Sequence, residues 1–227
     1  MTNATSTQPA QDKDQLIKGQ MEKMVDTYDS YMRKATFGRE HILRRMTVEM
    51  AGVKAGDTVL EIGCATGTLT LAAKQAAGPT GRVFGIDIIP GMIEASQRKA
   101  AQANVEVTFK VGSIDSIPFP DNQFDEVLCS FMIFHMSDET RRKGIAEIQR
   151  VLKPGGRLLL LDLALPPQPF QRWIAHKLLG FSAEDDLRNL IPLMEASGFS
   201  GMEHDPAKFR IMGLSVIAYL RGSARKA

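Results

Sequence analysis

The chain contains few cysteines, almost no excess charge and no long hydrophobic run. Its 227 residues include two cysteines, Cys64 and Cys129, too few for the disulfide framework that holds small secreted domains together. We therefore expect both to be thiols in a reducing, cytoplasmic compartment. The most hydrophobic run is interrupted by Asp162 and followed by Pro166, so it falls short of the roughly 20 apolar residues that a membrane-spanning helix needs. No stable membrane insertion is expected.

The charges of the chain nearly balance. Lysine and arginine number 28, aspartate and glutamate number 26, and the formal net charge is +2. Because nucleic-acid binding depends on a concentrated basic surface, this composition favours a small-molecule partner and no nucleic acid. Composition does not indicate the oligomeric state, and a homodimer stays open.

Short β-rich apolar runs alternate with longer segments of helical periodicity. The predicted strands are residues 58–62, 82–87, 105–111, 124–129 and 157–163, and the predicted helices between them are residues 68–77, 91–103 and 138–152. Such alternation is typical of βαβ units and predicts an α/β fold, a doubly wound parallel sheet with helices on both faces. The chain is long enough for one such domain and short for two.

The segments on either side of this core differ in character. Residues 1–14 are polar and have neither the basic start nor the apolar run of a signal peptide, so they are predicted to be a disordered tail. Residues 15–227 are then a single domain. Its first part, residues 15–50, predicts two helices that cover a ligand, and residues 166–182 follow a proline-rich break that suits a substrate-lid insertion. A helix over residues 184–197 and an antiparallel pair of strands, 201–204 and 214–220, are predicted to complete the domain.

The first predicted strand runs into a turn of small residues. Glu61-Ile-Gly-Cys-Ala-Thr-Gly67 precedes a helix that begins near Thr68. In open α/β sheets ligands bind beyond the carboxyl ends of the strands. Gly63, Ala65 and Gly67 let the backbone approach a ligand closely, and the helix N-terminus can donate to a ligand carboxylate. With Glu61 facing an ammonium group, the turn suits an amino acid better than a pyrophosphate.

The second predicted strand ends at Asp87, 20 residues after Gly67. A carboxylate there can accept hydrogen bonds from a ribose diol; the alternative is that Asp87 is a helix-capping or loop residue. A nicotinamide-dependent oxidoreductase would share both features. It would also need a third glycine in Gly-x-Gly-x-x-Gly, and this turn lacks one.

Four blocks of sequence together resemble one family. They are Val59-Leu-Glu-Ile-Gly-Cys-Ala-Thr-Gly67, Gly85-Ile-Asp87, Gly112-Ser-Ile-Asp-Ser-Ile-Pro-Phe119 with Phe124-Asp125, and Leu152-Lys-Pro-Gly-Gly156. In this order and spacing the chain resembles class I S-adenosylmethionine-dependent methyltransferases, particularly the branch with ubiquinone and menaquinone biosynthesis enzymes. The resemblance implies a seven-stranded, mostly parallel sheet of order 3-2-1-4-5-7-6 with an antiparallel last strand. It also implies S-adenosylmethionine as cofactor and S-adenosylhomocysteine as product.

The resemblance also assigns roles to individual residues. In this sequence Ala65 stands where relatives usually have glycine, and Ser113 stands where relatives commonly have an aspartate for the adenine amino group. The residues expected to bind the cofactor are Glu61, Gly63, Cys64, Ala65 and Gly67 around the methionine portion, Asp87 at the ribose, Ile88, Ser113 and Ile114 at the adenine, and Ser130 near the sulfonium.

Two further residues are candidates for the lid and for catalysis. Tyr28 lies in the N-terminal segment that in relatives folds over the cofactor, where an aromatic face beside a sulfonium is favourable. Core packing is the alternative. His135 follows the fourth strand and is the candidate general base or acceptor contact, the alternative being a hydrogen-bonded histidine packed beside Phe131 and Phe134. No metal site is expected.

The function that these observations favour is methyl transfer to a small apolar or aromatic acceptor at carbon, oxygen, nitrogen or sulfur. In-line displacement from a sulfonium depends largely on alignment and exclusion of water, so no catalytic residue is strictly required. The alternative from another class is a catalytically silent protein that binds S-adenosylmethionine as a sensor or scaffold.

Overall fold

The strands form one mixed sheet in a computed structural model that describes residues 8–164, 168–169, 173, 186–211 and 213–225. Within these residues the sheet has seven strands in the order β3-β2-β1-β4-β5-β7-β6. β1 to β5 pair in parallel, whereas β7 is antiparallel to both β5 and β6. The predicted strand order and the antiparallel last strand are confirmed. The strands are β1 (Thr58–Ile62), β2 (Arg82–Asp87), β3 (Thr108–Val111), β4 (Phe124–Ser130), β5 (Leu152–Leu163), β6 (Phe199–Pro206) and β7 (Ile217–Ala224).

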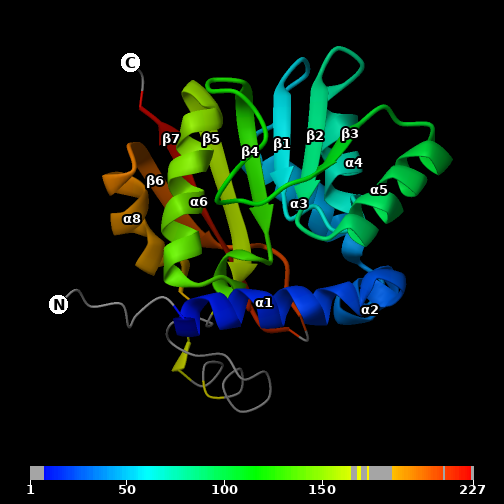
Figure 1. The fold of residues 1–227 in the computed structure, drawn as a ribbon, viewed down its shortest axis with the longest axis horizontal. Helices are drawn as coiled ribbons and strands as arrows, with labels where there is room; N and C mark the ends of the chain where they lie inside the picture. The colour runs from blue at the N-terminus through cyan, green and yellow to red at the C-terminus, as the bar shows by residue number, and fades with distance from the viewer. Residues whose placement is uncertain (1–7, 165–167, 170–172, 174–185, 212, 226–227) are drawn as a thin grey trace.

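Helices cover both faces of this sheet (Figure 1). Because side chains alternate along a strand, Val59 and Leu128 face α3 and α4, whereas Leu60 and Val127 face α6. The described helices are α1 (Gln8–Glu22), α2 (Tyr28–Ala35), α3 (Glu40–Ala51), α4 (Thr68–Ala77), α5 (Pro90–Ala103), α6 (Asp138–Val151) and α8 (Ile191–Ala196), with short 3-10 helices η1 (Val25–Thr27), η2 (Ile133–His135) and η3 (Leu187–Leu190).

The N-terminal helices lie across the carboxyl edge of the strands. In Figure 1 the arrowheads of β4 and β5 point toward α1, which runs along that edge into α2. The disordered tail predicted for residues 1–14 is wrong over residues 8–14, which belong to α1. The physical reason is that Lys13 and Asp14 have partners: both bond to the segment between η2 and α6.

Two other predicted boundaries shift for local reasons. β3 begins at Thr108 rather than at residue 105, because the N–H of Val105 still bonds to the carbonyl of Ala100 at the end of α5. β5 begins at Leu152, earlier than predicted, because Leu152 already pairs with Phe124 of β4 before a bulge.

The segment after β5 differs most from the prediction. The single helix expected over residues 184–197 is wrong: η3 precedes α8, and residues 184–185 lie outside the described part of the chain. Pro192 stands in the first turn of α8, a position that proline tolerates because the N–H there has no partner within the helix. The substrate lid predicted for residues 166–182 lies outside the described residues except for residues 168–169 and 173.

The C-terminal end of α3 is fixed to the sheet by two arginines. Arg157 Nη2 donates to the carbonyl of Gly52 at 2.9 Å, and Arg221 Nη1 donates to that of Met50 at 3.0 Å. Arg157 also pairs at 2.8 Å with Glu126, whose side chain is fully buried. Cations are favourable at a helix C-terminus. α3 is therefore held rigidly, with its first turns toward the carboxyl edge of the sheet.

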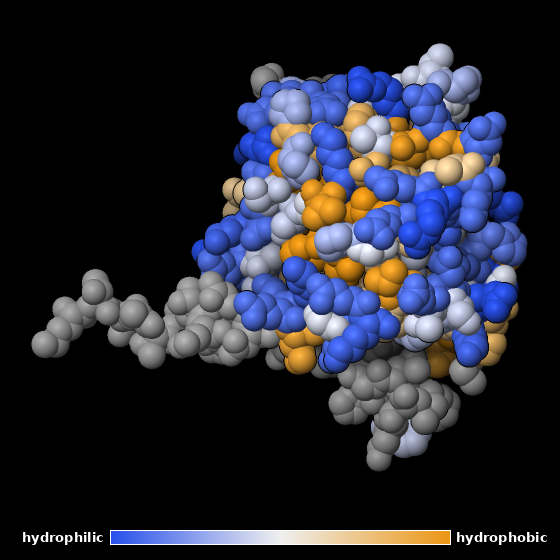
Figure 2. All heavy atoms as spheres, turned by 45° about the vertical axis from the view of Figure 1, so that its right-hand side comes forward, coloured by the Kyte–Doolittle hydropathy of each residue, from blue (hydrophilic) through white to orange (hydrophobic). Residues whose placement is uncertain are grey.

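The face of the molecule drawn in Figure 2 is mixed in hydropathy. Figure 2 shows hydrophobic residues interspersed with hydrophilic ones over the face that it presents. None of the helices in the described ranges combines the length and the apolar character needed to cross a membrane.

Candidate cofactor-binding site

The turn between β1 and α4 has a left-handed backbone at three positions. Gly63, Ala65 and Gly67 have φ angles of 68°, 45° and 80°. A Cβ added to Gly63 would lie 2.3 Å from Met132 Sδ, and one added to Gly67 would lie 2.9 Å from Phe109 Cζ. Both positions therefore favour glycine, because the space that a Cβ would take is filled by Met132 at Gly63 and by Phe109 at Gly67. Ala65 adopts this conformation at a steric cost.

Asp87 holds the strained turn in place. Its side chain is buried at the end of β2, where Oδ2 accepts the N–H of Ala65 at 2.9 Å and Oδ1 accepts the N–H of Ile89 at 3.0 Å. Burial raises the pKa of Asp87, and these backbone donors partly oppose the rise. Each carboxylate oxygen keeps a second lone pair. Asp87 can thus organise two loops and still accept from a diol.

Glu61 is a buried carboxylate beside the same turn. It is 2% exposed and accepts a hydrogen bond from Thr70 Oγ1 of α4. Burial raises the pKa of Glu61 to about 7, the negative charge of Asp87 adds to the rise, and Thr70 and Arg44 oppose it. A carboxylate that is costly to ionise becomes favourable once a ligand cation pairs with it.

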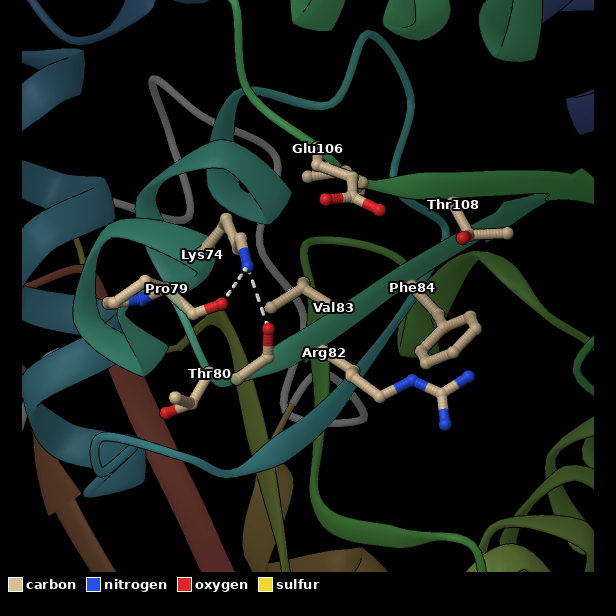
Figure 3. A pocket seen from close by; sticks show the side chains of 10 residues that line it. Lys74, Pro79, Thr80, Arg82, Val83, Phe84, Glu106 and Thr108 are labelled. Atoms are coloured by element: carbon tan, nitrogen blue, oxygen red, sulfur yellow. Dashed lines mark hydrogen bonds between the residues drawn. The ribbon is translucent and has the colours of Figure 1, made fainter.

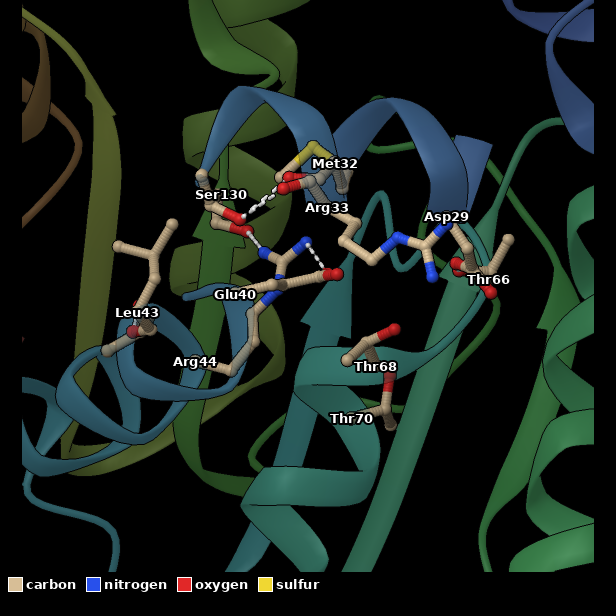
Figure 4. Close-up of polar contacts among 12 residues, drawn as sticks. Asp29, Met32, Arg33, Glu40, Leu43, Arg44, Thr66, Thr68, Thr70 and Ser130 are labelled. Atoms are coloured by element: carbon tan, nitrogen blue, oxygen red, sulfur yellow. Dashed lines mark hydrogen bonds and ion pairs between the residues drawn. The ribbon is translucent and has the colours of Figure 1, made fainter. Parts of the chain in front are cut away.

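Arg44 is a candidate site residue that the sequence analysis missed. It lies on α3 with a side chain only 7% exposed, pairs with Glu40 at 3.1 Å and donates to Ser130 Oγ at 3.4 Å (Figure 4). Its charge also lowers the pKa of Glu61. Arginine offers a planar fork of donors that matches a carboxylate. The available signal was a cation on the buried face of a helix, one turn before Val48 and two turns before Ala51.

The α1–α2 segment covers this turn. Tyr28 packs with Met21 and Val25 against Ala65 and Ile89. The pKa of the Tyr28 hydroxyl is raised by burial, with Arg44, which bonds to it, opposing the rise. Tyr28 therefore packs beside the glycine turn, and its contact with a cofactor stays a prediction.

A polar bridge fixes the same cover to α5, and sequence reasoning did not find it. Asp29 accepts a hydrogen bond from Thr66 Oγ1 at 2.5 Å and pairs with Lys99 Nζ at 2.8 Å. Lys99 donates in turn to Thr66 Oγ1 and Thr68 Oγ1. The start of α2 is thereby tied to the end of the turn that leads into α4, and to α5.

The residues predicted to contact the adenine differ in exposure. Ile88 is 45% exposed, as a residue that contacts a ligand ring would be. Ser113 bonds to Asp115. The side chain of Ile114 is buried and lies against Gly144 of α6, so only the backbone of Ile114 is available to a ligand.

Cys64 and His135 have contrasting surroundings. The thiol of Cys64 is buried among Ile93, Ala100 and Phe109, and burial raises its pKa well above the usual value. Cys64 is therefore a neutral core residue whose backbone alone belongs to the turn. His135 is exposed in η2, just after β4.

A small cavity lies at the other end of the sheet. It has a volume of about 200 Å³ and is lined by the start of β2 and β3, with Lys74 donating to the carbonyls of Pro79 and Gly81 (Figure 3). Ligands of parallel α/β sheets bind at the carboxyl ends. This cavity is therefore separate from the glycine turn and contributes nothing to it.

Known proteins with similar sequences share this architecture. A family model for a methyltransferase domain matches residues 59–156. The demethylmenaquinone methyltransferase of Symbiobacterium thermophilum is 32% identical over 72% of this chain, which spans 64% of that relative's length. The 2-phytyl-1,4-naphtoquinone methyltransferase of Synechocystis sp. is 30% identical over 76% of this chain and 73% of its own length.

A solved structure has the same fold. The crystal structure of a SAM-dependent methyltransferase from Aquifex aeolicus superposes with a TM-score of 0.66 at 20% identity, over 91% of this chain and 97% of that one. The similar sequences and the similar structure indicate the same family. The chain belongs to the class I S-adenosylmethionine-dependent methyltransferases, a family that includes enzymes of ubiquinone and menaquinone biosynthesis.

Proposed function

We propose that the chain transfers a methyl group from S-adenosylmethionine to a small apolar or aromatic acceptor. The observation that carries the proposal is a pair of buried, opposite charges beside the glycine turn: the carboxylate of Glu61 and the guanidinium of Arg44. An amino acid presents an ammonium and a carboxylate group, and these two side chains complement them. Asp87, which also bonds to the turn, is the acceptor that we assign to the ribose attached to that amino acid.

The residues fit the cofactor in three parts. Glu61 would hold the ammonium group and Arg44 the carboxylate, with Ser130 bonded to Arg44. Asp87 would accept from the ribose hydroxyls. Ile88 would cover one face of the adenine, with Ser113 and the backbone of Ile114 at its edge. When bound, S-adenosylmethionine supplies a methyl group made electrophilic by the sulfonium.

The protein contributes alignment and exclusion of water. The cover formed by α1 and α2 closes the turn from solvent through Tyr28 and Asp29. By their printed names, the relatives reported above are methyltransferases of demethylmenaquinone and of 2-phytyl-1,4-naphtoquinone, which supports a quinone-like acceptor with an apolar ring. The partly buried side chains of Met132, Phe134 and Met136 follow β4 and offer an apolar wall for such a ring.

Calorimetry and a transfer assay test the proposal together. S-adenosylhomocysteine should bind, and NADH should not. Incubation with methyl-labelled S-adenosylmethionine and chemically reduced demethylmenaquinone, alongside simple phenols, amines and thiols, should label at least one acceptor. Binding without transfer to any acceptor would favour the silent sensor, and binding of NADH alone would overturn the proposal.

His135 gives a prediction about the acceptor side. If the acceptor is a phenol or quinol, a histidine base near the emerging methyl group contributes to the rate. We expect His135→Ala to lower kcat by about 100-fold, within the range for general bases, and to leave the affinity for S-adenosylhomocysteine unchanged. His41→Ala, at an exposed position on α3, is the control. Unchanged turnover of His135→Ala across the pH range would exclude the role.

A further inference from the structure

The loop between β4 and α6, residues 131–137, is held by side chains from other elements. Phe131 has a φ of 56°, a strained conformation for a residue other than glycine. Two residues further on, the N–H of Ile133 donates to Oδ2 of Asp162 at 3.2 Å, and Asp162 is buried at the end of β5. This end of the loop is therefore fixed from the sheet.

The other end of the loop is fixed from α1. Lys13 Nζ donates to the carbonyls of Phe134 and Met136, at 3.2 Å each. Asp14 accepts the N–H of Ser137 at 2.7 Å and the hydroxyl of Ser137 at 2.8 Å. Lys13 thus holds carbonyl groups on both sides of His135, and the adjacent Asp14 holds the N–H and hydroxyl of Ser137.

Asp14 also completes the N-terminus of α6. It accepts the hydroxyl of Thr140 at 2.7 Å, in the first turn of the helix that Ser137 caps. Burial acts to raise the pKa of Asp14, but the hydrogen bonds from Thr140 and Ser137 outweigh it and the pKa is lowered. A carboxylate at a helix N-terminus is favourable. The charged form of Asp14 is the form that this contact stabilises.

The same N-terminal segment reaches the cofactor side. Beyond Lys13 and Asp14, the chain continues through Met21 and Val25 to Tyr28, and these three pack against the cluster formed by Ala65 of the glycine turn, Ile89 and Met92. One continuous stretch, residues 13–29, therefore contacts both the loop that carries His135 and the turn that would hold the cofactor.

We propose that Lys13 and Asp14 are positioning residues: through them α1 sets the conformation of the loop that carries His135, so that closure of α1 and α2 over the cofactor also shapes the acceptor side of the site. The effect on the acceptor side rests on the proposed function. The positioning of the loop rests only on the contacts that Lys13 and Asp14 make within this chain.

Hydrogen exchange of residues 131–140 tests the positioning directly. In the ligand-free protein, a Lys13→Ala/Asp14→Ala variant should exchange in this loop about tenfold faster than the wild type, because the loop loses partners for two carbonyls and an amide. Lys18→Ala, on the same helix and paired with Glu22 one turn further on, is the matched control and should leave exchange unchanged. Equal protection of the loop in the wild type and the double variant would overturn the proposal.

Ligand titration separates this proposal from the proposed function. With saturating S-adenosylhomocysteine, the wild type should gain protection in the loop and the double variant should not, although both bind with similar affinity. With reduced demethylmenaquinone as probe, the double variant should have a higher acceptor KM or a lower kcat than the wild type. The conservative variant Lys13→Arg, in which Asp14 is unchanged, should keep both parameters near their wild-type values. Failure of S-adenosylhomocysteine to bind the wild type would contradict the proposed function, whereas normal binding with an unresponsive loop would contradict the coupling.

Discussion

A Glu61→Gln variant is expected to bind S-adenosylhomocysteine about 100-fold more weakly than the wild type, while its ligand-free form becomes more stable at alkaline pH. The first effect follows from the loss of the one buried carboxylate placed for the ligand ammonium. The second follows because a glutamine avoids the cost of a buried charge. Weaker ligand binding together with higher stability of the ligand-free protein would indicate that Glu61 serves ligand binding rather than folding.

The pH dependence of the second effect has a defined sign. Burial raises the pKa of Glu61 from 4.5 to about 7, so the folded protein binds this proton more tightly than the unfolded chain. The resulting stabilisation is fully present below pH 4.5 and is lost as the pH rises to about 7. The shift corresponds to about 3 kcal/mol. Glu61→Gln should therefore unfold like the wild type at pH 4.5 and require more urea at pH 8.

Binding of the ligand should show the opposite trend with pH. A ligand ammonium pairs with charged Glu61, so the affinity of the wild type for S-adenosylhomocysteine should rise between pH 6 and pH 8, whereas that of Glu61→Gln should stay flat. Calorimetry in buffers at pH 6 and pH 8 measures the affinity of each protein for S-adenosylhomocysteine. Glu106→Gln, at an exposed position, is the control. A variant that is less stable than the wild type at pH 8 would show that pairing of Glu61 with Arg44 outweighs its burial.

The second large effect is expected at Arg44. Arg44→Ala should weaken the binding of S-adenosylhomocysteine by about 100-fold, because a charge-assisted, bidentate contact with the carboxylate is lost. It should also lower the free energy of unfolding by about 3 kcal/mol, since Glu40 loses its buried partner. Arg45→Ala is the matched control: Arg45 is the next residue on α3, and its side chain is 71% exposed.

A truncated ligand distinguishes the ligand contact from general damage. 5′-Methylthioadenosine carries the nucleoside but no ammonium or carboxylate group. Arg44→Ala and Glu61→Gln should bind it as the wild type does, whereas Asp87→Asn should bind both ligands poorly. Arg44→Lys keeps the charge without the fork and should fall between wild type and Arg44→Ala. Equal losses for both ligands in Arg44→Ala would refute the assignment of Arg44 to the carboxylate.

Local patterns explain why most of the core was predictable. β1 and α4 begin and end where apolar periodicity and the glycine turn place them, because both signals act within a few residues. The glycine turn and Asp87 were found for the same reason: they adjoin the ends of buried strands. Family resemblance then supplied the order of the last two strands.

The missed residues act through distant partners. Arg44 contacts Ser130, 86 residues away, and Asp14 contacts Ser137, 123 residues away. A polar N-terminal segment with a weak apolar pattern gave no reason to expect a helix, since its partners are carbonyls of Phe134 and Met136 and the side chains of Ser137 and Thr140. Hydrogen bonds between residues this far apart in the chain produce no local periodic pattern in the sequence.

The place of β7 in the sheet has a consequence for biosynthesis. β7, the last strand in sequence, lies between β5 and β6 rather than at an edge, and its antiparallel partners cover residues 217–224. The sheet cannot close until those residues have left the ribosome exit tunnel. During translation the nascent chain must therefore carry β5 with an unpaired edge, and this is the stage at which chaperones would have to shield it from aggregation.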